Sequence, residues 1–411
     1  MADGEADALE AFREEVRAWL EENHPKSLRK RQLSEEEAMA EAAGFGDMSE
    51  DAKLWKERIG KKGWGVPTWP KQYGGGGLTL GQSRVLNQEM QRIGATNPIG
   101  GMGTGMFGPT LLEFGNEAQK KQHISKIATG EVRWCQGFSE PGAGSDLASL
   151  QLKCEDKGDH FLVNGSKIWT SGANHADWCF CLVRTDTSKK HEGISFLLID
   201  MKTPGVDPRP IETIGGSSPF CQTFFTDVKV PKENLMGELN KGWTYAKRLL
   251  QFERQGSSGR GDGAPVRGAG QKTIGAIAAE YLEKDSSGRL GEKDIRSRIA
   301  THQMEQTAFR LTAQRVAAEA RGSNSPTTTT SILKNVGAKT GQDRAELMIE
   351  IMGNRGFGWE GAGFNKEELG AVRGWLGGKA TSIFAGSHEV QNNIISKRIL
   401  ALPDSLATQS N

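Results

Sequence analysis

The chain of 411 residues contains no run of about 20 apolar residues, so the sequence predicts no membrane-spanning helix. Neither sign of charge dominates, because 52 basic residues stand against 51 acidic ones and leave a formal charge of +1. That balance predicts no general attraction to nucleic acid or to an anionic membrane, and it leaves open a local basic cleft. The N-terminus, MADGEADALE, has neither an apolar core nor an Arg-rich amphipathic stretch. We therefore expect no signal or transit peptide and a cytoplasmic protein.

Cysteine is scarce, odd in number and without a Cys-x-x-Cys pair, since only five cysteines occur in the chain. Cys179 and Cys181 lie two positions apart in an apolar, strand-like run, so both side chains are expected on one face of a sheet. We predict buried free thiols in a reducing compartment, and no metal site.

What the sequence does contain is a hydrophobic pattern that changes twice along the chain. Residues 6 to about 130 show apolar side chains at helical spacing, beginning with a helix over residues 6–22 and including a helix pair over 108–130. Short β-branched and aromatic runs such as HFLVNG, DWCFCLVR, GISFLLID and TFFTDVKV follow, and helical patterns then return. The pattern predicts an α+β chain with an N-terminal helical domain, an antiparallel β domain and a C-terminal helical domain, over residues 1–133, 134–242 and 243–411.

Glycine-rich segments separate several of the predicted elements. The segment GGMGTGMFG at residues 100–108 faintly suggests a phosphate-binding loop, but it lacks the preceding strand and the Lys-Ser/Thr of such a loop. We interpret it as a connection between helices. Residues 256–270 and 323–330 are predicted to be two further loops.

The most informative stretch, WCQGFSEPGAGSDLASL, covers residues 134–150. Gly142 and Gly144 let the backbone approach a flat or anionic ligand closely. Ser139 and Ser145 add hydroxyl groups and are small enough to leave room for a ligand. By itself this segment would be interpreted as an ordinary turn.

A second stretch, NGSKIWTSGANHADW, places Trp169 beside Thr170 and Ser171, directly before a Gly-Ala-Asn turn. An aromatic face with two neighbouring hydroxyl donors suits a flavin ring, which has a π-face and polar N5 and O4 edges. The alternative is that Trp169 is a core residue, and this segment alone would favour that alternative.

Together the two stretches resemble the acyl-CoA dehydrogenase family, whose pattern is approximately L/V-T-E-P-x-A-G-S-D followed by N-G-x-K-x-W-I-T. The spacing between the motifs fits, and FGPTLLEFGNEAQKKQHISKIATGE and IFAGSHEVQNNIISKRIL are further matches. The resemblance covers nearly the whole chain. It implies an acyl-CoA dehydrogenase-like fold with an N-terminal α-helical domain, a middle antiparallel β domain and a C-terminal four-helix bundle, with FAD between the last two.

The resemblance also implies which residues of the two motifs contact FAD, namely Phe138, Ser139, Gly144, Ser145, Trp169, Thr170 and Ser171. Ser139 and Ser171 replace threonines of the family and keep the hydroxyl group. Further cofactor contacts, some of them supplied by a neighbouring subunit in the family, match His302, Gln303, Glu350, Gly353, Asn354, Ser387 and Glu389.

Three positions depart from the family pattern on the cofactor side. Glu350 replaces a glutamine and Asn354 replaces a glycine. Glu292 stands where the family often has an arginine on the FAD pyrophosphate. The arginines that could take over this role are Arg289, Arg296 and Arg298.

The family's reaction needs a carboxylate that abstracts a Cα proton while the Cβ hydride passes to N5 of the flavin. Many members carry that glutamate before a Gly-Thr/Ser pair near the C-terminus, where this chain has Ala385. The backbone N–H of Ala385 could still donate to the thioester carbonyl. A branch of the family places the glutamate on the first long helix after the β domain, just before an arginine. The segment KGWTYAKRLLQFERQ carries Glu253 and Arg254 at that point, so the resemblance implies Glu253 as the base.

The sequence leaves other interpretations of these residues open. Glu253 and Arg254 could be an ordinary surface or structural ion pair, and His388 is a competing acid or base. The substrate contacts implied by the resemblance are Ser145, Phe252, Arg254 and Gly386.

The implied activity is α,β-dehydrogenation of an acyl-CoA to the trans-2-enoyl-CoA, as in β-oxidation, with an electron-transferring flavoprotein as electron acceptor. The expected assembly is a homotetramer or dimer, or a heterotetramer with a related subunit. Two alternatives stay open: a flavin oxidase, monooxygenase or desulfinase of the same fold, and a non-catalytic partner subunit. The length and shape of the acyl group stay open as well.

Overall fold

The computed structural model describes residues 2–29, 49–259, 272–320 and 329–403. The chain divides into two compact units. The first, here called the N-terminal unit, comprises residues 1–211 and 218–253. The second, the C-terminal unit, comprises residues 212–217 and 254–411.

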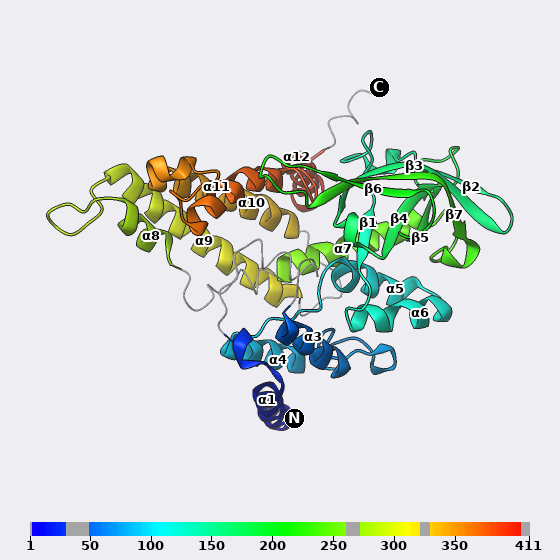
Figure 1. Ribbon diagram of the computed structural model, residues 1–411, viewed down its shortest axis with the longest axis horizontal. Helices are drawn as coiled ribbons and strands as arrows, with labels where there is room; N and C mark the ends of the chain where they lie inside the picture. Colours follow the sequence, from blue (N-terminus) through cyan, green and yellow to red (C-terminus); the bar gives the residue numbers. More distant parts are fainter. Residues whose placement is uncertain (1, 30–48, 260–271, 321–328, 404–411) are drawn as a thin grey trace. The chain divides into compact units, whose positions relative to one another are not determined.

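The N-terminal unit begins with helices that pack around one apolar cluster (Figure 1). They are α1 (Ala2–Asn23), α3 (Glu50–Lys61) and α4 (Leu80–Ile93). The predicted first helix is confirmed, and it starts four residues before the predicted position 6. Val16 and Leu20 of α1 are fully buried at the spacing of one helical turn, which is what the periodicity predicted.

One buried carboxylate ties the first of these helices to the third. Glu89 of α4 is only 2% exposed and accepts hydrogen bonds from Arg13, Arg17 and Arg92. These bonds, that of Arg17 first, lower the pKa of Glu89 to about 2. The carboxylate therefore stays charged and paired across the pH range in which proteins work.

The predicted helix pair is confirmed as α5 (Gly108–Phe114) and α6 (Glu117–Ala128). The segment before it is not a plain connection, because residues 103–107 already form a π-helical turn that runs directly into α5. Leu111 and Ile127 of this pair share an apolar cluster with Phe180 and Phe196 of the sheet, so the pair covers one sheet face (Figure 1).

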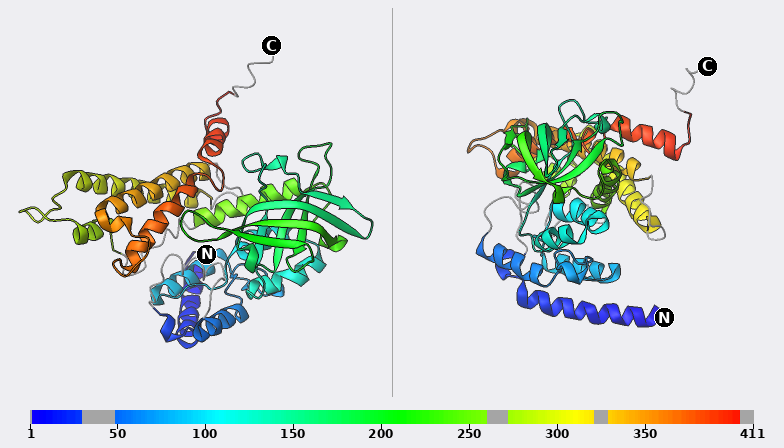
Figure 2. Two further views of the ribbon diagram at one scale, coloured as in Figure 1. Left: turned by 45° about the horizontal axis from the view of Figure 1, so that its top comes forward. Right: turned by 90° about the vertical axis from the view of Figure 1, so that its right-hand side faces the viewer.

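In the described part of the chain, seven strands form one strongly twisted sheet (Figure 2). The strands are β1 (Trp134–Gly137), β2 (Lys153–Asp156), β3 (His160–Ser171), β4 (Trp178–Arg184), β5 (Ile194–Asp200), β6 (Val206–Ile211) and β7 (Phe220–Pro231). Their order is β1-β4-β2-β3-β7-β6, with β5 paired to β4. Most pairings are antiparallel as predicted, but β4 runs parallel to both β1 and β2.

The face of the sheet opposite α5 and α6 holds all five cysteines. Each is a buried free thiol, and all belong to one apolar cluster together with residues such as Phe161 and Val228. Cys179 and Cys181 lie on the same side of β4, as the sequence predicted, while Phe180 and Leu182 belong to the cluster on the other side. Burial raises the pKa of the Cys154 thiol to about 12, so this thiol is unreactive.

Helix α7 (Gly242–Gly259) follows the sheet and is anchored in the N-terminal unit by Tyr245, Ala246 and Leu249. The predicted loop over residues 256–270 is therefore wrong at its start, because α7 continues to Gly259. Residues 260–270 of that prediction lie outside the described residues.

The C-terminal unit is helical, as predicted. Its helices are α8 (Ile274–Tyr281), α9 (Lys293–Ala320), α10 (Thr330–Met352), α11 (Lys366–Gly378) and α12 (His388–Ile394). Helix α10 packs against α9, α11 and α12. The predicted loop over 323–330 lies largely outside the described residues, and Thr330 already belongs to α10. No helix among the described residues is long and apolar enough to cross a membrane.

Candidate active site

The loop that follows β1 is held in place by a buried lysine. Lys167 of β3 is fully buried, and its Nζ donates to the carbonyl oxygen of Phe138 at 2.9 Å and to Oε1 of Glu140 at 2.7 Å. The Glu140 carboxylate also accepts backbone N–H bonds from Gln151 and Leu152. A charge pair thus fixes the backbone at the start of the predicted flavin loop. Neither Lys167 nor Glu140 was predicted as a site residue, although each occupies a defined position in one of the two family motifs.

Phe138 and Ser139, the first predicted flavin contacts, present mainly their backbone. Phe138 is only 4% exposed, and its ring packs edge-on against Phe180 and Phe196 in the core. The carbonyl of Ser139 accepts a hydrogen bond from the N–H of Ile168 at 2.9 Å. A ligand at this loop would therefore meet backbone and the Ser139 hydroxyl, and not the Phe138 ring.

Trp169, in contrast, faces outward in the N-terminal unit. Its side chain is 54% exposed, its φ is +60°, and its ring meets only the edge of Phe220 among the ring contacts of the described residues. The alternative that Trp169 is a core residue is wrong. A large exposed indole ring can stack against a flat ligand, and its strained backbone conformation is typical of a functional position.

The predicted pair of hydroxyl groups beside Trp169 needs a correction. Thr170 is fully buried, and its hydroxyl bonds to the Cys221 carbonyl at 2.8 Å and to the Thr223 hydroxyl at 2.6 Å. The Thr170 hydroxyl is therefore occupied by hydrogen bonds inside the sheet. Of the two predicted residues beside Trp169, Ser171 is the one that is partly exposed.

Gly144 and Ser145 lie exposed on the loop beyond Glu140. A Cβ atom added at Gly142 or at Gly144 would meet no atom within 4 Å. The fold does not need glycine at these positions for its own packing. Open backbone beside an exposed indole fits a flat cofactor such as FAD.

Replacing Trp169 by alanine is expected to weaken FAD binding by about tenfold while changing the free energy of unfolding of the apoprotein by less than about 1 kcal/mol. The reason is that its ring is largely exposed. The matched control is Phe138→Ala, which removes a buried ring and should cost about 3–5 kcal/mol. Flavin fluorescence titration and urea denaturation measure the two effects. Equal destabilisation by both variants would refute the assignment of Trp169 to a ligand surface.

Glu253 and Arg254 are both in helix α7, which establishes the predicted long helix after the sheet. Their side chains lie outside the described residues. The residue before them, Phe252, is half-buried, and the Arg248 guanidinium lies 4.5 Å from the centre of its ring. Arg248 also bonds to Glu113 of α5 at 2.8 Å, which secures this turn of the helix to the N-terminal unit.

In the C-terminal unit, Ala385 occupies a strained turn just before α12. Its φ is +52° and that of Gly386 is +88°. The Ala385 carbonyl accepts a hydrogen bond from Nε2 of the buried Gln391 at 3.1 Å. Ser387 caps α12 by accepting the Val390 N–H at 3.4 Å. A non-glycine residue held at positive φ by these bonds marks a backbone whose orientation is imposed by the fold.

The two residues after this turn start helix α12. Glu389 is exposed, and a hydrogen bond from Ser387 lowers the pKa of its carboxyl group. Nε2 of His388 is buried and has no hydrogen-bond partner among the described residues. Its backbone carbonyl accepts a bond from Asn335 at 3.4 Å.

His302 and Gln303 lie together on α9. His302 is 5% exposed, and neither ring nitrogen has a hydrogen-bond partner in the described part of the chain. Burial lowers the pKa of His302, so its ring is neutral and offers one donor and one acceptor. Gln303 is exposed. Orphaned buried nitrogens next to an exposed amide fit a binding position.

Glu350 is already paired, because Arg298 bonds to both of its carboxylate oxygens, with Nη2 at 2.8 Å from Oε1. This removes Arg298 from the arginines that could replace the missing pyrophosphate contact at Glu292. Arg296 bonds to the Leu290 carbonyl at 2.8 Å. Arg289 is exposed and makes no ion pair with the described residues.

The turn after α10 contains the remaining cofactor candidates. Gly353 has a φ of +53°, and Asn354 beside it is exposed. A Cβ atom added at Gly353 would meet nothing within 4 Å, so its glycine is required by backbone conformation and not by packing.

Three family models match successive parts of the chain. They are the N-terminal domain of acyl-CoA dehydrogenase over residues 6–131, the middle domain over 135–228 and the C-terminal domain over 240–400. Acyl-CoA dehydrogenase IpdE1 of Mycobacterium tuberculosis is 32% identical over 405 residues, covering 96% of this chain and 98% of that protein. IpdE1 of Mycolicibacterium smegmatis is 31% identical over 409 residues, with the same coverage of both chains.

Solved structures of similar fold include the Tcur3481-Tcur3483 steroid ACAD, which is 29% identical with a TM-score of 0.74. The match covers 97% of this chain and 98% of that one. The ChsE4-ChsE5 complex of Mycobacterium tuberculosis is 26% identical, with a TM-score of 0.70 and the same coverage.

Proposed function

Because this chain belongs to the acyl-CoA dehydrogenase family, an FAD-dependent family of enzymes, we propose that it converts an acyl-CoA to the trans-2-enoyl-CoA with Glu253 as base. The observation that carries the assignment of the base is the position of residue 253 on α7. Ala246, Leu249, Leu250 and Glu253 follow one another at i, i+3, i+4 and i+7, which is the spacing of one helix face. Ala246 and Leu249 are fully buried. The base of this reaction is a carboxylate, and removal of a carboxylate from water raises its pKa and makes it a stronger base.

The residue that stands in the other position of the family's base is Ala385, which has no side chain that can carry a proton. We assign to its backbone N–H a hydrogen bond to the thioester carbonyl, where negative charge develops as the Cα proton leaves. The imposed left-handed turn at Ala385 and Gly386 supports this assignment, because a fixed donor needs no reorganisation during the reaction. Phe252, Arg254 and Ser145 complete the proposed substrate contacts.

FAD, when bound, supplies the two-electron acceptor that takes the Cβ hydride at N5. We assign the exposed face of Trp169 and the hydroxyls of Ser139 and Ser171 to the flavin end of the site. The positions assigned to the remainder of the cofactor are Gly144, His302, Gln303, Glu350, Gly353, Asn354, Ser387 and Glu389. Because Glu350 is held by Arg298, its contact with FAD would require that ion pair to open or to be shared.

The test of the activity is anaerobic mixing of the purified protein with an acyl-CoA. A dehydrogenase is expected to be yellow, to lose its flavin colour with acyl-CoA, and to regain it on addition of an electron-transferring flavoprotein. Rapid recovery of the colour with oxygen alone would contradict the dehydrogenase and indicate an oxidase or monooxygenase. A colourless protein that takes up no FAD would indicate a non-catalytic partner subunit.

We also propose that the working enzyme contains a second chain, either another copy or a related subunit. The orphaned ring nitrogens of His302 support a contact from outside the described residues of this chain. Two of the similar structures, Tcur3481-Tcur3483 and the ChsE4-ChsE5 complex, are each named for two components, which favours the related subunit.

A further inference from the structure

The turn at Ala385, to which the donor for the thioester carbonyl is assigned, is held by one buried amide. Gln391 of α12 is only 3% exposed, and its Nε2 donates to the Ala385 carbonyl oxygen at 3.1 Å. The backbone N–H of Gln391 donates to the Ser387 carbonyl at 2.9 Å, so its side chain starts from the first turn of the helix. The other end of the amide, Oε1, is buried and has no hydrogen-bond partner among the described residues. An amide is buried at a cost when its oxygen stays unpaired, which indicates that the bond of its nitrogen to Ala385 has a use beyond stability.

The backbone beside Ala385 leaves room for this amide. A Cβ atom added at Gly386 would lie 2.5 Å from Nε2 of Gln391, and the φ of Gly386 is +88°. A side chain at position 386 would therefore push the amide away from the Ala385 carbonyl. Helix α12 is itself fixed to α10, because Nδ2 of Asn335 donates to Oδ1 of Asn392 at 2.8 Å. The amide thus reaches the turn from an anchored helix.

The direction of the Ala385 N–H depends on the angle φ, because φ is the rotation about the bond from N to Cα. The φ of Ala385 is +52°, which is unfavourable for a residue with a Cβ atom. On the N-terminal side, the N–H groups of Ile383 and Phe384 donate to the Ala380 carbonyl at 2.9 and 3.0 Å. On the C-terminal side, the bond from Gln391 holds the Ala385 carbonyl. The strain of a left-handed alanine and the net stabilisation by one hydrogen bond are of the same order, so loss of the Gln391 amide would let Ala385 rotate.

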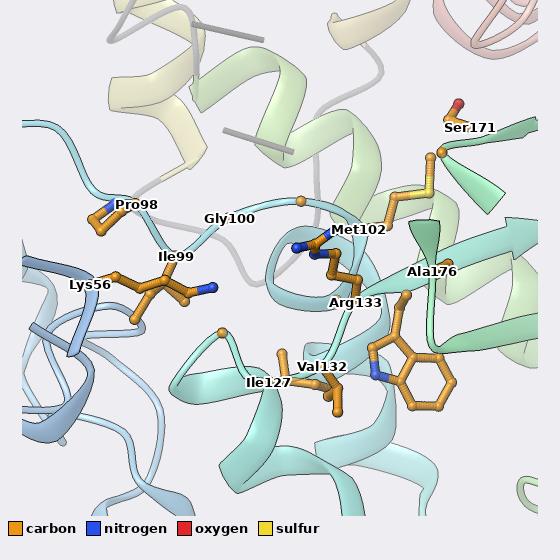
Figure 3. A pocket seen from close by; sticks show the side chains of 15 residues that line it. Lys56, Pro98, Ile99, Gly100, Met102, Ile127, Val132, Arg133, Ser171 and Ala176 are labelled. Atoms are coloured by element: carbon orange, nitrogen blue, oxygen red, sulfur yellow. The ribbon is translucent and has the colours of Figure 1, made fainter. Parts of the chain in front are cut away.

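The cavity beside Ser171 in the N-terminal unit does not provide another place for the thioester (Figure 3). Its volume is about 90 Å³, and Lys56 and Arg133 are among the residues that line it. A site for a molecule as large as a CoA thioester needs about 300 Å³ or more. Ala385, in contrast, lies exposed on its unit, and its N–H has no acceptor among the described residues. A fixed N–H without an acceptor on an exposed turn can donate to a ligand.

We propose that Gln391 is a positioning residue for the abstraction of the Cα proton, because it holds Ala385 in the conformation that directs its N–H to the thioester carbonyl. The inference rests on the proposed function, which assigns the proton to Glu253 and the carbonyl to Ala385. When the Cα–H bond breaks, the proton passes to the Glu253 carboxylate and the electron pair is delocalised onto the carbonyl oxygen. A donor held in place stabilises the charge on that oxygen, so the Cα–H group becomes more acidic. Gln391 acts only through Ala385.

The test measures the acidity of a bound thioester that can lose its Cα proton but cannot transfer a hydride. In (methylthio)acetyl-CoA a sulfur atom replaces Cβ, and the acyl part is small enough to fit an acyl pocket of any length. Its enolate beside oxidised FAD gives a long-wavelength charge-transfer band, which is titrated with pH on the FAD-loaded protein. Gln391→Met keeps the length of the side chain and removes the amide. This variant should raise the pH at which half of the bound probe is deprotonated by about one to two units, or about 10- to 100-fold in acidity. The matched control is Asn393→Leu, which replaces an exposed amide of the same helix and should leave that pH unchanged.

Gln391→Asn is the second variant, in case Gln391→Met does not fold. Its amide is one methylene group shorter and falls short of the Ala385 carbonyl, so the same rise is expected. An unchanged midpoint in either folded variant would overturn the inference, even if urea unfolds that variant more easily, because lower stability alone does not change the acidity of the probe. An equal rise in Asn393→Leu would overturn it as well. A wild-type protein that binds FAD and the probe but gives no band at any pH would instead contradict the proposed proton abstraction itself, and the inference with it.

Discussion

Replacing Glu253 by glutamine is expected to slow flavin reduction by an acyl-CoA by about 10³- to 10⁴-fold, with the affinity for FAD and for acyl-CoA changed by no more than a few-fold. Glutamine has nearly the size of glutamate, but its amide cannot accept the Cα proton at neutral pH. The Ala385 position offers no replacement carboxylate. The rate is measured by stopped-flow absorbance of the flavin under anaerobic conditions, and the affinities by titration.

The control for this variant is His388→Gln, which removes the competing acid or base. Because the Nε2 atom of His388 is buried, a small loss of stability is expected but no loss of the chemical step. If Glu253→Gln reduces the flavin at the wild-type rate, Glu253 is not the base. If only His388→Gln greatly slows flavin reduction, His388 is the base instead.

The order of helical, β and helical parts could be predicted because each part repeats its own hydrophobic period. Val16 and Leu20 mark the helical period in α1, and DWCFCLVR marks a strand that is buried on both faces. The end of α7 could not be predicted in the same way. The glycines and serines at positions 256–259 predicted a loop, yet the helix continues to Gly259, since glycine weakens a helix only by about 1 kcal/mol relative to alanine.

In the candidate site, the motifs predicted which backbone segments matter but not which side chains are exposed. Along an ideal strand, Lys167 and Trp169 would point to the same face. The pairing of β3 with β7 shifts register between Lys167 and Thr170, and Trp169 takes a positive φ. Lys167 and Thr170 are therefore buried, and Trp169 is exposed. A local break of this kind depends on the neighbouring strand, so alternation along one strand could not predict it.

Contacts between residues that are far apart in the chain also could not be predicted from the sequence. Lys56 and Arg133 line one cavity although they are far apart in the chain, and no motif joins them. Among the predicted cofactor contacts, Glu350 departs from the family pattern because it replaces a glutamine. The structure pairs it with Arg298, 52 positions away, so two of the altered or candidate residues satisfy each other.

Replacing Lys167 by methionine is expected to lower the free energy of unfolding by about 3–5 kcal/mol, because it leaves the Glu140 carboxylate buried without its counter-charge. The variant also removes the donor to the Phe138 carbonyl, which holds the start of the flavin loop. We therefore expect weaker FAD binding in whatever fraction still folds. Urea denaturation and flavin titration measure the two effects.

The matched control is Lys153→Met, which removes an ion pair with Glu155 on the exposed side of the sheet, where the lysine side chain is 64% exposed. That change should cost less than about 1 kcal/mol. The double variant Lys167→Met with Glu140→Gln separates charge from packing: it should be less destabilised than the sum of the single variants, with a coupling of about 1–3 kcal/mol. If Lys167→Met costs no more than Lys153→Met, the charge pair does not hold the loop, and the backbone bonds of Gln151 and Leu152 to Glu140 must be sufficient without it.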